Sequence, residues 1–237
     1  MIGSLLALGF LYGLRHALDA DHVAAMAALV SRSPSPVKAT RLGLVWGLGH
    51  TLTLLVFGMG VMLLERLLSQ RLALLLESAV GGMLVLLGGE LLWRMVRDRI
   101  HIHAHRHVET DHYHLHFHSH SGEVGHDPVQ HRHPHADTGL PRAFMVGLMH
   151  GMAGSAALVL LAPGPLHSFT TGLTYLLAFG LGSTLGMGLI SVVISLPLRF
   201  ASHTLTSYYH LLQGLIGGGT VAMGGWMLLT LFPRLLN

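Results

Sequence analysis

Histidine and aspartate are concentrated in one short part of the N-terminal apolar stretch. Two histidines, two aspartates and one arginine fall within eight residues: Arg15, His16, Asp19, Asp21 and His22. The surrounding run, residues 2–30, is long enough to cross a bilayer as a helix. A charged side chain at mid-membrane costs roughly 2.5–3.5 kcal/mol on insertion scales, so such groups persist where they are paired, hydrated or used. Imidazole and carboxylate groups this close together predict a cation pathway through the membrane, with His16, Asp19, Asp21 and His22 as metal ligands.

Helical periodicity suggests how these groups share one site. On a regular helix, residues spaced three apart are neighbours on the surface, so we expect His16, Asp19 and His22 to face the same way. Asp21 lies on another face and joins them only if the helix is distorted. It otherwise serves Arg15 or the second nitrogen of a ligating histidine. The alternative is a buried salt-bridge network that fixes helix packing.

Other spans contribute fewer polar residues. His50 and His150 each follow a Gly-Leu-x motif like the one before His16, and we predict His50 as a further ligand. His150 and Ser183 are candidates for a pathway through the second half of the chain. We expect Arg15 and Thr51 to contact the ligands and hold them in place, although a hydrogen bond between two helices is the simpler explanation of the Thr51 hydroxyl.

Composition and hydropathy define the fold class. The 237 residues are 51% hydrophobic and 11% charged, with no cysteine, and the mean hydropathy is +0.57. A soluble domain would carry about a quarter charged residues. We predict an all-α integral membrane protein with six transmembrane helices. The predicted spans are residues 2–30, 42–64, 72–96, 142–163, 169–197 and 206–232.

Basic residues predict the orientation in the membrane. The first, third and fifth loops hold ten of the basic residues, whereas the opposite side holds Arg66, Arg71 and Arg234. Positive-inside bias therefore predicts a multi-pass protein of the cell (inner) membrane, with those loops in the cytoplasm and both termini outside. The isoelectric point is basic because the lysine and arginine residues lie in the loops between apolar segments, so we expect no nucleic acid as a partner.

The two halves of the chain resemble each other. Gly13-Leu14-Arg15-His16 recurs as residues 147–150, residues 47–52 recur as residues 180–185, and both the third and sixth spans carry two Gly-Gly pairs seven residues apart. Three spans is an odd number, so the second copy must insert upside down. We predict a 3+3 inverted repeat, with a substrate site near the bilayer midplane. Its parts are residues 1–98, a histidine-rich loop at residues 99–140, and residues 141–237.

The loop between the halves is a second signal for metal. Residues 101–135 carry 13 of the 20 histidines, many in alternation with other residues. This composition is typical of metal binding, and we expect the loop to be disordered without metal. We predict a cytoplasmic metal buffer, the alternative being a dispensable tract. Its candidate ligands are His101, His103, His105, His107, His112, His114, His116, His118 and His120.

The first-span string Arg-His-Ala-Leu-Asp-Ala-Asp-His resembles the signature of the nickel/cobalt transporter family, and Gly49-His50-Thr51 is similar to the second motif of that family. A third motif of the family is replaced by residues 150–158, which look more like the UreH-type urease-accessory branch. The resemblance implies transport of Ni²⁺ or Co²⁺, with His16, Asp21 and His22 essential.

These observations predict uptake of Ni²⁺ or Co²⁺ across the membrane, without an organic cofactor or enzymatic activity. Efflux with the histidine-rich loop as a cytoplasmic sensor is the first alternative, and a non-transporting accessory role in metal delivery to urease or hydrogenase is the second. The predicted partners are the lipid bilayer and a divalent metal ion. Delivery to cytoplasmic metal chaperones and assembly as a homo-oligomer are left open.

Overall fold

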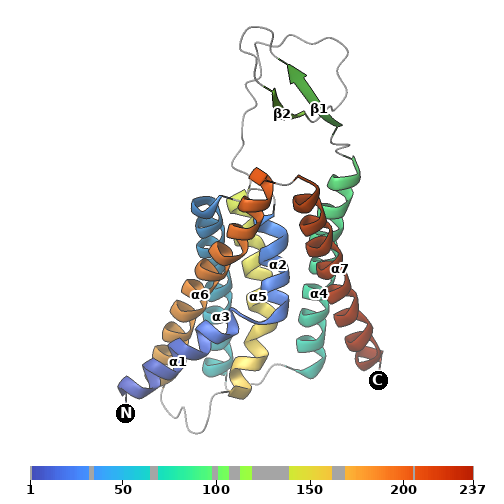
Figure 1. The fold of residues 1–237 in the computed structure, drawn as a ribbon. Helices are drawn as coiled ribbons and strands as arrows, with labels where there is room; N and C mark the ends of the chain where they lie inside the picture. Colours follow the sequence, from blue (N-terminus) through green and yellow to red (C-terminus); the bar gives the residue numbers. More distant parts are fainter. Residues whose placement is uncertain are drawn as a thin grey trace.

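The protein is a bundle of helices (Figure 1). The structure is a computed structural model that describes residues 2–31, 35–64, 69–97, 101–106, 113–118, 139–161, 169–204 and 206–236. The helices are α1 (Ile2–His16), α2 (Ala20–Val30), α3 (Pro36–Leu64), α4 (Gln70–Arg97), α5 (Gly139–Leu161), α6 (Phe169–Thr204) and α7 (Thr206–Leu236).

The first predicted span is two helices, and the expectation of one continuous helix is wrong. The last turn of α1 is closed by hydrogen bonds from the backbone N–H groups of Leu18 and Asp19 to carbonyls three residues earlier. Asp19 then occupies the N-cap position of α2 in an extended conformation (φ −60°, ψ 144°), and its carbonyl accepts the first α2 bond, from Val23. Aspartate is among the preferred N-cap residues, and Asp21 in the first turn also suits a helix N-terminus.

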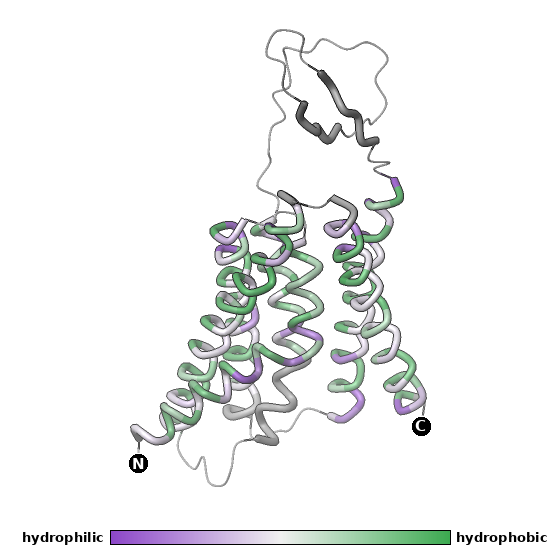
Figure 2. Tube along the Cα trace, in the orientation of Figure 1, coloured by the Kyte–Doolittle hydropathy of each residue, from purple (hydrophilic) through white to green (hydrophobic). Residues whose placement is uncertain are grey.

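Four of the described helices are long and apolar enough to cross a membrane: residues 36–60, 70–97, 169–202 and 208–235. The other two predicted spans fall on the α1–α2 pair and on α5. Apolar residues cover much of the outside of the bundle, and hydrophilic residues also occur at mid-height, near the junction of α1 and α2 (Figure 2). Both termini lie at one end of the bundle, and α4 ends at the opposite end (Figure 1). The protein is therefore a helical membrane protein.

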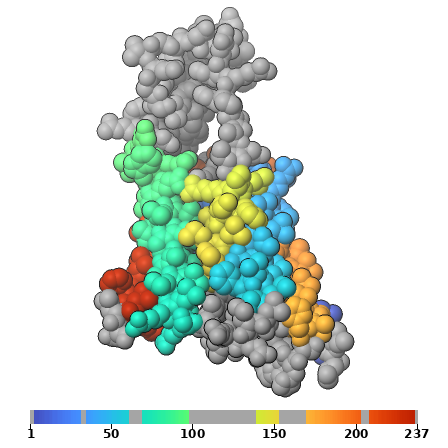
Figure 3. All heavy atoms as spheres, turned by 180° about the vertical axis from the view of Figure 1, so that it is seen from behind, coloured from blue at the N-terminus to red at the C-terminus, as the bar shows by residue number. Residues whose placement is uncertain are grey.

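Helix pairs from the two halves pack through closely approaching backbones. In α1 and α6, Gly13 faces the backbone of Phe179 and Gly182 faces that of Phe10. The corresponding contacts join α5 and α3, where Gly147 faces the backbone of Trp46 and Gly49 faces that of Phe144. Figure 3 shows α5 lying between α3 and α4. A side chain at these glycines would collide with main chain, so small residues are required there.

The central helices α3 and α6 are joined by a hydroxyl pair at equivalent positions of the two halves. The hydroxyl of Thr51 donates to the carbonyl of Gly180, 3.0 Å away, and lies 3.0 Å from the hydroxyl of Thr184. Helix bonding, the alternative reading of Thr51, is therefore what the structure describes. The same arrangement of contacts recurs in both halves.

Within the histidine-rich segment the structure describes two strands, β1 (His101–Arg106) and β2 (Tyr113–His118). They pair antiparallel, and their register sets histidine opposite histidine three times: His101 with His118, His103 with His116, and His105 with His114. His107, His112 and His120 lie outside the described residues.

Candidate metal site

Three histidines from three helices meet at the centre of the bundle. One nitrogen each of His16, His22 and His50 lies within 4.8 Å of the other two. The ring centroids of His16 and His22 are 4.6 Å apart, and each lies just over 5 Å from the His50 ring. His16 ends α1, His22 lies in the first turn of α2 and His50 is the central residue of α3. The break between α1 and α2 brings the first two rings together.

A fourth histidine joins this cluster from the second half of the chain. The His150 ring lies 5.0 Å from the ring of His22, and its Nε2 lies 3.9 Å from a carboxylate oxygen of Asp21. His150 is the central residue of α5. The sequence singled it out for a second-half pathway, whereas the structure brings it beside the first-half ligands. We call His16, His22, His50 and His150 the histidine cluster.

The two aspartates contact the outer nitrogens of their neighbouring histidines. The Nδ1 atom of His16 lies 2.7 Å from Asp19, and that of His22 lies 3.0 Å from Asp21. Asp21 also accepts a 2.9 Å hydrogen bond from the backbone N–H of His22. An ionised carboxylate only accepts hydrogen bonds, so each Nδ1 carries the hydrogen and each Nε2 keeps its lone pair. Histidines that bind metals usually donate the other ring N–H to a carboxylate in this way, which fixes the orientation of the ring.

The inward nitrogens of the cluster are buried and lack hydrogen-bond partners among the described residues. They are Nε2 of His16, His22 and His150, and both ring nitrogens of His50. The Nδ1 of His150 lies 3.4 Å from the carbonyl of Val146, which again leaves Nε2 with its lone pair. Buried polar atoms are normally paired, so several unpaired nitrogens at one point indicate a ligand. Neutral imidazole is a ligand for nickel, copper and zinc.

Two helix ends meet at the cluster. The C-terminus of α1 carries partial negative charge, and the N-terminus of α2 carries partial positive charge, with Asp21 in its first turn. The site therefore combines imidazole lone pairs with two nearby carboxylates.

The remaining predicted residues lie around the cluster. Arg15 is exposed and has no hydrogen bond or ion pair with the described residues, so no contact supports the role expected for it. Ser183 is fully buried, and its hydroxyl has no partner among the described residues. Its backbone nitrogen packs against Gly13, one turn of α1 before His16.

Sequence reasoning missed two aromatic residues that touch the cluster. The ring of Trp46 lies 5.4 Å from that of His22 and 5.3 Å from that of His150. The ring of Phe179 lies 5.4 Å from that of His16. Both are buried. Their positions in the sequence could have identified them. Trp46 lies one helical turn before His50, and Phe179 lies one turn before Ser183, which corresponds to His50 in the second half.

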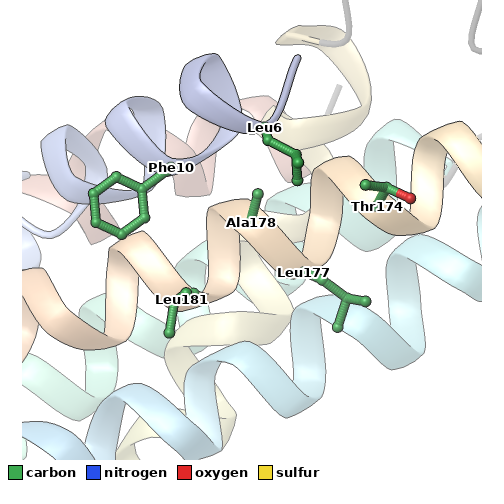
Figure 4. A pocket seen from close by; sticks show the side chains of 6 residues that line it. All are labelled: Leu6, Phe10, Thr174, Leu177, Ala178 and Leu181. Carbon is green, nitrogen blue, oxygen red and sulfur yellow. The ribbon is translucent and has the colours of Figure 1, made fainter. Parts of the chain in front are cut away.

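A cavity of about 390 Å³ lies between α1 and α6, away from the histidines (Figure 4). It is lined by Leu6, Phe10, Thr174, Leu177, Ala178 and Leu181. This open, apolar groove has no group able to hold a cation, apart from one hydroxyl. The buried cluster, not this groove, is therefore the candidate metal site.

A buried imidazole cluster inside a bundle of apolar helices is the arrangement expected of a membrane protein that handles a transition-metal ion. Comparison with known proteins agrees. Residues 2–211 match the family model described as high-affinity nickel-transport protein, and the chain belongs to this family. The urease accessory protein UreH of Bacillus sp. (strain TB-90) is 32% identical over 218 residues, which cover 89% of this chain and 84% of that protein. No solved structure matches. The predicted family resemblance is confirmed, and the family is one of nickel transport, not of catalysis.

Proposed function

We propose that this protein carries Ni²⁺ across the cytoplasmic membrane into the cell, and that the histidine cluster is its transport site. The observation that carries the proposal is the set of buried, unpaired imidazole nitrogens that meet where α1 gives way to α2 and at the midpoints of α3 and α5. A site midway through the bundle is where a transporter holds its substrate between the two sides of the membrane. Co²⁺, which accepts the same donors, is a second substrate.

His16, His22 and His50 supply the three nearest nitrogens, and His150 approaches from the second half. Asp19 and Asp21, which the sequence suggested as direct ligands, act instead by holding His16 and His22 in the tautomer and orientation that ligation needs. Both carboxylates also offset the charge of the entering ion. All donors are nitrogen or oxygen, which suits Ni²⁺ and Co²⁺ better than Cu⁺.

The conformational change that carries the ion across the membrane depends on an inverted repeat with three spans in each half. Its support is the recurrence of glycine contacts between α1 and α6 and between α5 and α3, together with the Thr51–Thr184 hydroxyl pair. Two halves that pack in equivalent ways can exchange roles, so that the site opens first to one side and then to the other.

The loop between the halves is a metal buffer on the cytoplasmic side, and both termini are outside. The support for this orientation is the excess of basic residues in this loop and in the first and fifth loops. The support for metal binding is the β1–β2 register, which pairs histidine positions across the hairpin.

Nickel accumulation in cells tests the transport proposal. Cells that produce the native chain should gain radiolabelled Ni²⁺, and a His50→Ala variant should not. Thr53→Ala is a matched control, because Thr53 is also buried on α3 but bonds only within its own helix. Equal accumulation by the native chain and His50→Ala would refute the site. Less nickel in native cells than in variant cells would indicate efflux.

Metal delivery to an enzyme is the second candidate, favoured by the relative described as a urease accessory protein. The two readings differ in purified proteoliposomes. A transporter moves Ni²⁺ into liposomes when a membrane potential is applied, whereas a delivery protein binds the ion and leaves the internal concentration unchanged.

A further inference from the structure

Two buried aromatic rings flank the histidine cluster. Trp46 lies one turn of α3 before His50, and none of it is exposed. Phe179 lies one turn of α6 before Ser183, and it is 3% exposed. Each ring contacts a histidine at about the same distance: Trp46 lies 5.3 Å from His150, and Phe179 lies 5.4 Å from His16.

The two rings lie toward opposite ends of the bundle. Helices α3 and α6 run antiparallel: Gly43 packs against Met187, whereas Gly58, further along α3, packs against Leu176, earlier in α6. The N-terminal part of α3 therefore lies at the end of the bundle where α4 finishes (Figure 1). The N-terminal part of α6 lies at the opposite end, which holds both termini. We call the first the loop end and the second the terminal end.

The rings are equivalent under the internal repeat. Trp46 and Phe179 are 133 residues apart, as are Thr51 and Thr184. Their histidine partners, His150 and His16, follow the same relation with an offset of 134 residues. The Trp46–His150 and Phe179–His16 contacts are therefore counterparts in the two halves, at nearly equal distances. Trp46 also contacts His22, whose equivalent position in the second half holds no histidine.

We propose that Trp46 and Phe179 are the two gates of the transport pathway. This proposal rests on the transport function proposed above. In the present conformation both rings cover the cluster. Displacement of Trp46 opens the cluster toward the loop end, and displacement of Phe179 opens it toward the terminal end. A hydrated divalent cation cannot pass either ring where it now lies, because both are enclosed by helix packing.

Trp46 has a further property that suits a moving group. Its indole Nε1 is buried and has no hydrogen-bond partner among the described residues. A buried indole N–H normally finds a partner, and leaving one unpaired destabilises the closed position. Rotation of the ring toward water would give this N–H a partner. The closed and open positions of Trp46 are therefore closer in free energy than burial of the ring alone would suggest.

Thiol labelling tests the gates directly, because the chain has no cysteine. Ser183→Cys introduces one thiol beside the cluster, one turn from Phe179. A membrane-impermeant thiol reagent is applied to sealed vesicles of either orientation, and a tag after Asn237 identifies the terminal side. With both gates intact we expect slow labelling from both sides. Adding Trp46→Ala should raise the rate at least tenfold from the loop side alone, and Phe179→Ala should do so from the terminal side alone.

Leu84→Ala is the matched control, since Leu84 is fully buried but packs at the α4–α7 contact. It should change neither rate. The leucine variants of both aromatic residues, which keep more of the packing, should give the same sidedness with smaller increases. Equal increases from both sides, or no increase in folded variants, would overturn the gates. Labelling does not require transport: one-sided labelling in a protein that moves no Ni²⁺ in liposomes would support the gates and refute the transport function.

Discussion

The aspartates offer a sharp test of how the cluster is built. If Asp19 and Asp21 only orient His16 and His22, their replacement by asparagine should weaken Ni²⁺ binding without abolishing it. Loss of such a supporting group typically lowers metal affinity 10–100-fold, or roughly 1.4–2.7 kcal/mol. Asp21 is 25% exposed and makes two bonds to His22, so its variant should lie near the upper value. The Asp19 side chain is 53% exposed and makes one bond, so Asp19→Asn should lie near the lower value.

Removal of a metal ligand should weaken Ni²⁺ binding more than removal of an orienting aspartate. Structural zinc sites are worth roughly 10–16 kcal/mol, so one of four ligands contributes on the order of 3 kcal/mol, or more than 100-fold. We therefore expect His22→Ala to bind more weakly than Asp21→Asn. The control is Glu77→Gln, which removes a carboxylate from α4 far along the chain from these ligands, and should leave affinity unchanged.

Tryptophan fluorescence provides the assay. Trp46 contacts the cluster, whereas Trp93 and Trp226 are 56% and 67% exposed. Replacing the latter two with phenylalanine leaves Trp46 as the only reporter, and quenching by bound Ni²⁺ gives the dissociation constant. The orienting role would be refuted if Asp21→Asn lost as much affinity as His22→Ala, because the carboxylate would then behave as a ligand.

Three other predictions concern packing and the loop. Gly13→Val should lower the melting temperature in detergent, because the new side chain would collide with the backbone of α6 at a cost of at least about 1–3 kcal/mol. Gly82→Ala is the control, because Gly82 faces open space, and it should leave the melting temperature unchanged. Equal melting temperatures for the two variants would contradict the close packing. A double-mutant cycle of Thr51→Val and Thr184→Val should give a coupling of about 0.6 kcal/mol, typical of hydrogen bonds between membrane helices, and zero coupling would remove the pair as a helix contact. Deletion of residues 101–135 should leave Ni²⁺ uptake intact but reduce the number of ions bound per chain in equilibrium dialysis; loss of uptake would assign the loop to the pathway.

The sequence allowed the helical membrane class and most of the cluster to be predicted. Apolar length revealed the long helices, and the rarity of ionisable groups inside a membrane drew attention to His16, His22 and His50. Proximity of His150 could not be read from spacing, because it depends on how α5 packs against α3 through Gly147 and Gly151. The aromatic contacts depend on the same packing.

The break after α1 was missed because no proline or glycine marks it. Its signal is Asp19, which favours an N-cap, followed by Asp21 in the first turn of the next helix. The Asp19 carboxylate makes no cap hydrogen bond and contacts His16 instead. One residue thus both starts α2 and orients a cluster histidine.

The geometry of a regular helix shows why this break matters for the site. Six residues of continuous helix would separate His16 and His22 by about 9 Å along the axis and by about 240° around it. Rings on such different faces could not approach as they do, with centroids 4.6 Å apart. The expectation that one regular helix would turn both histidines to the same face is therefore wrong, and the break between α1 and α2 brings them together. The repeat alone cannot explain the cluster, because the equivalent His150 lies in the middle of the continuous helix α5. The backbone contacts between helices are nearly the same in both halves, but only the first half bends its helix to bring two imidazoles to one point.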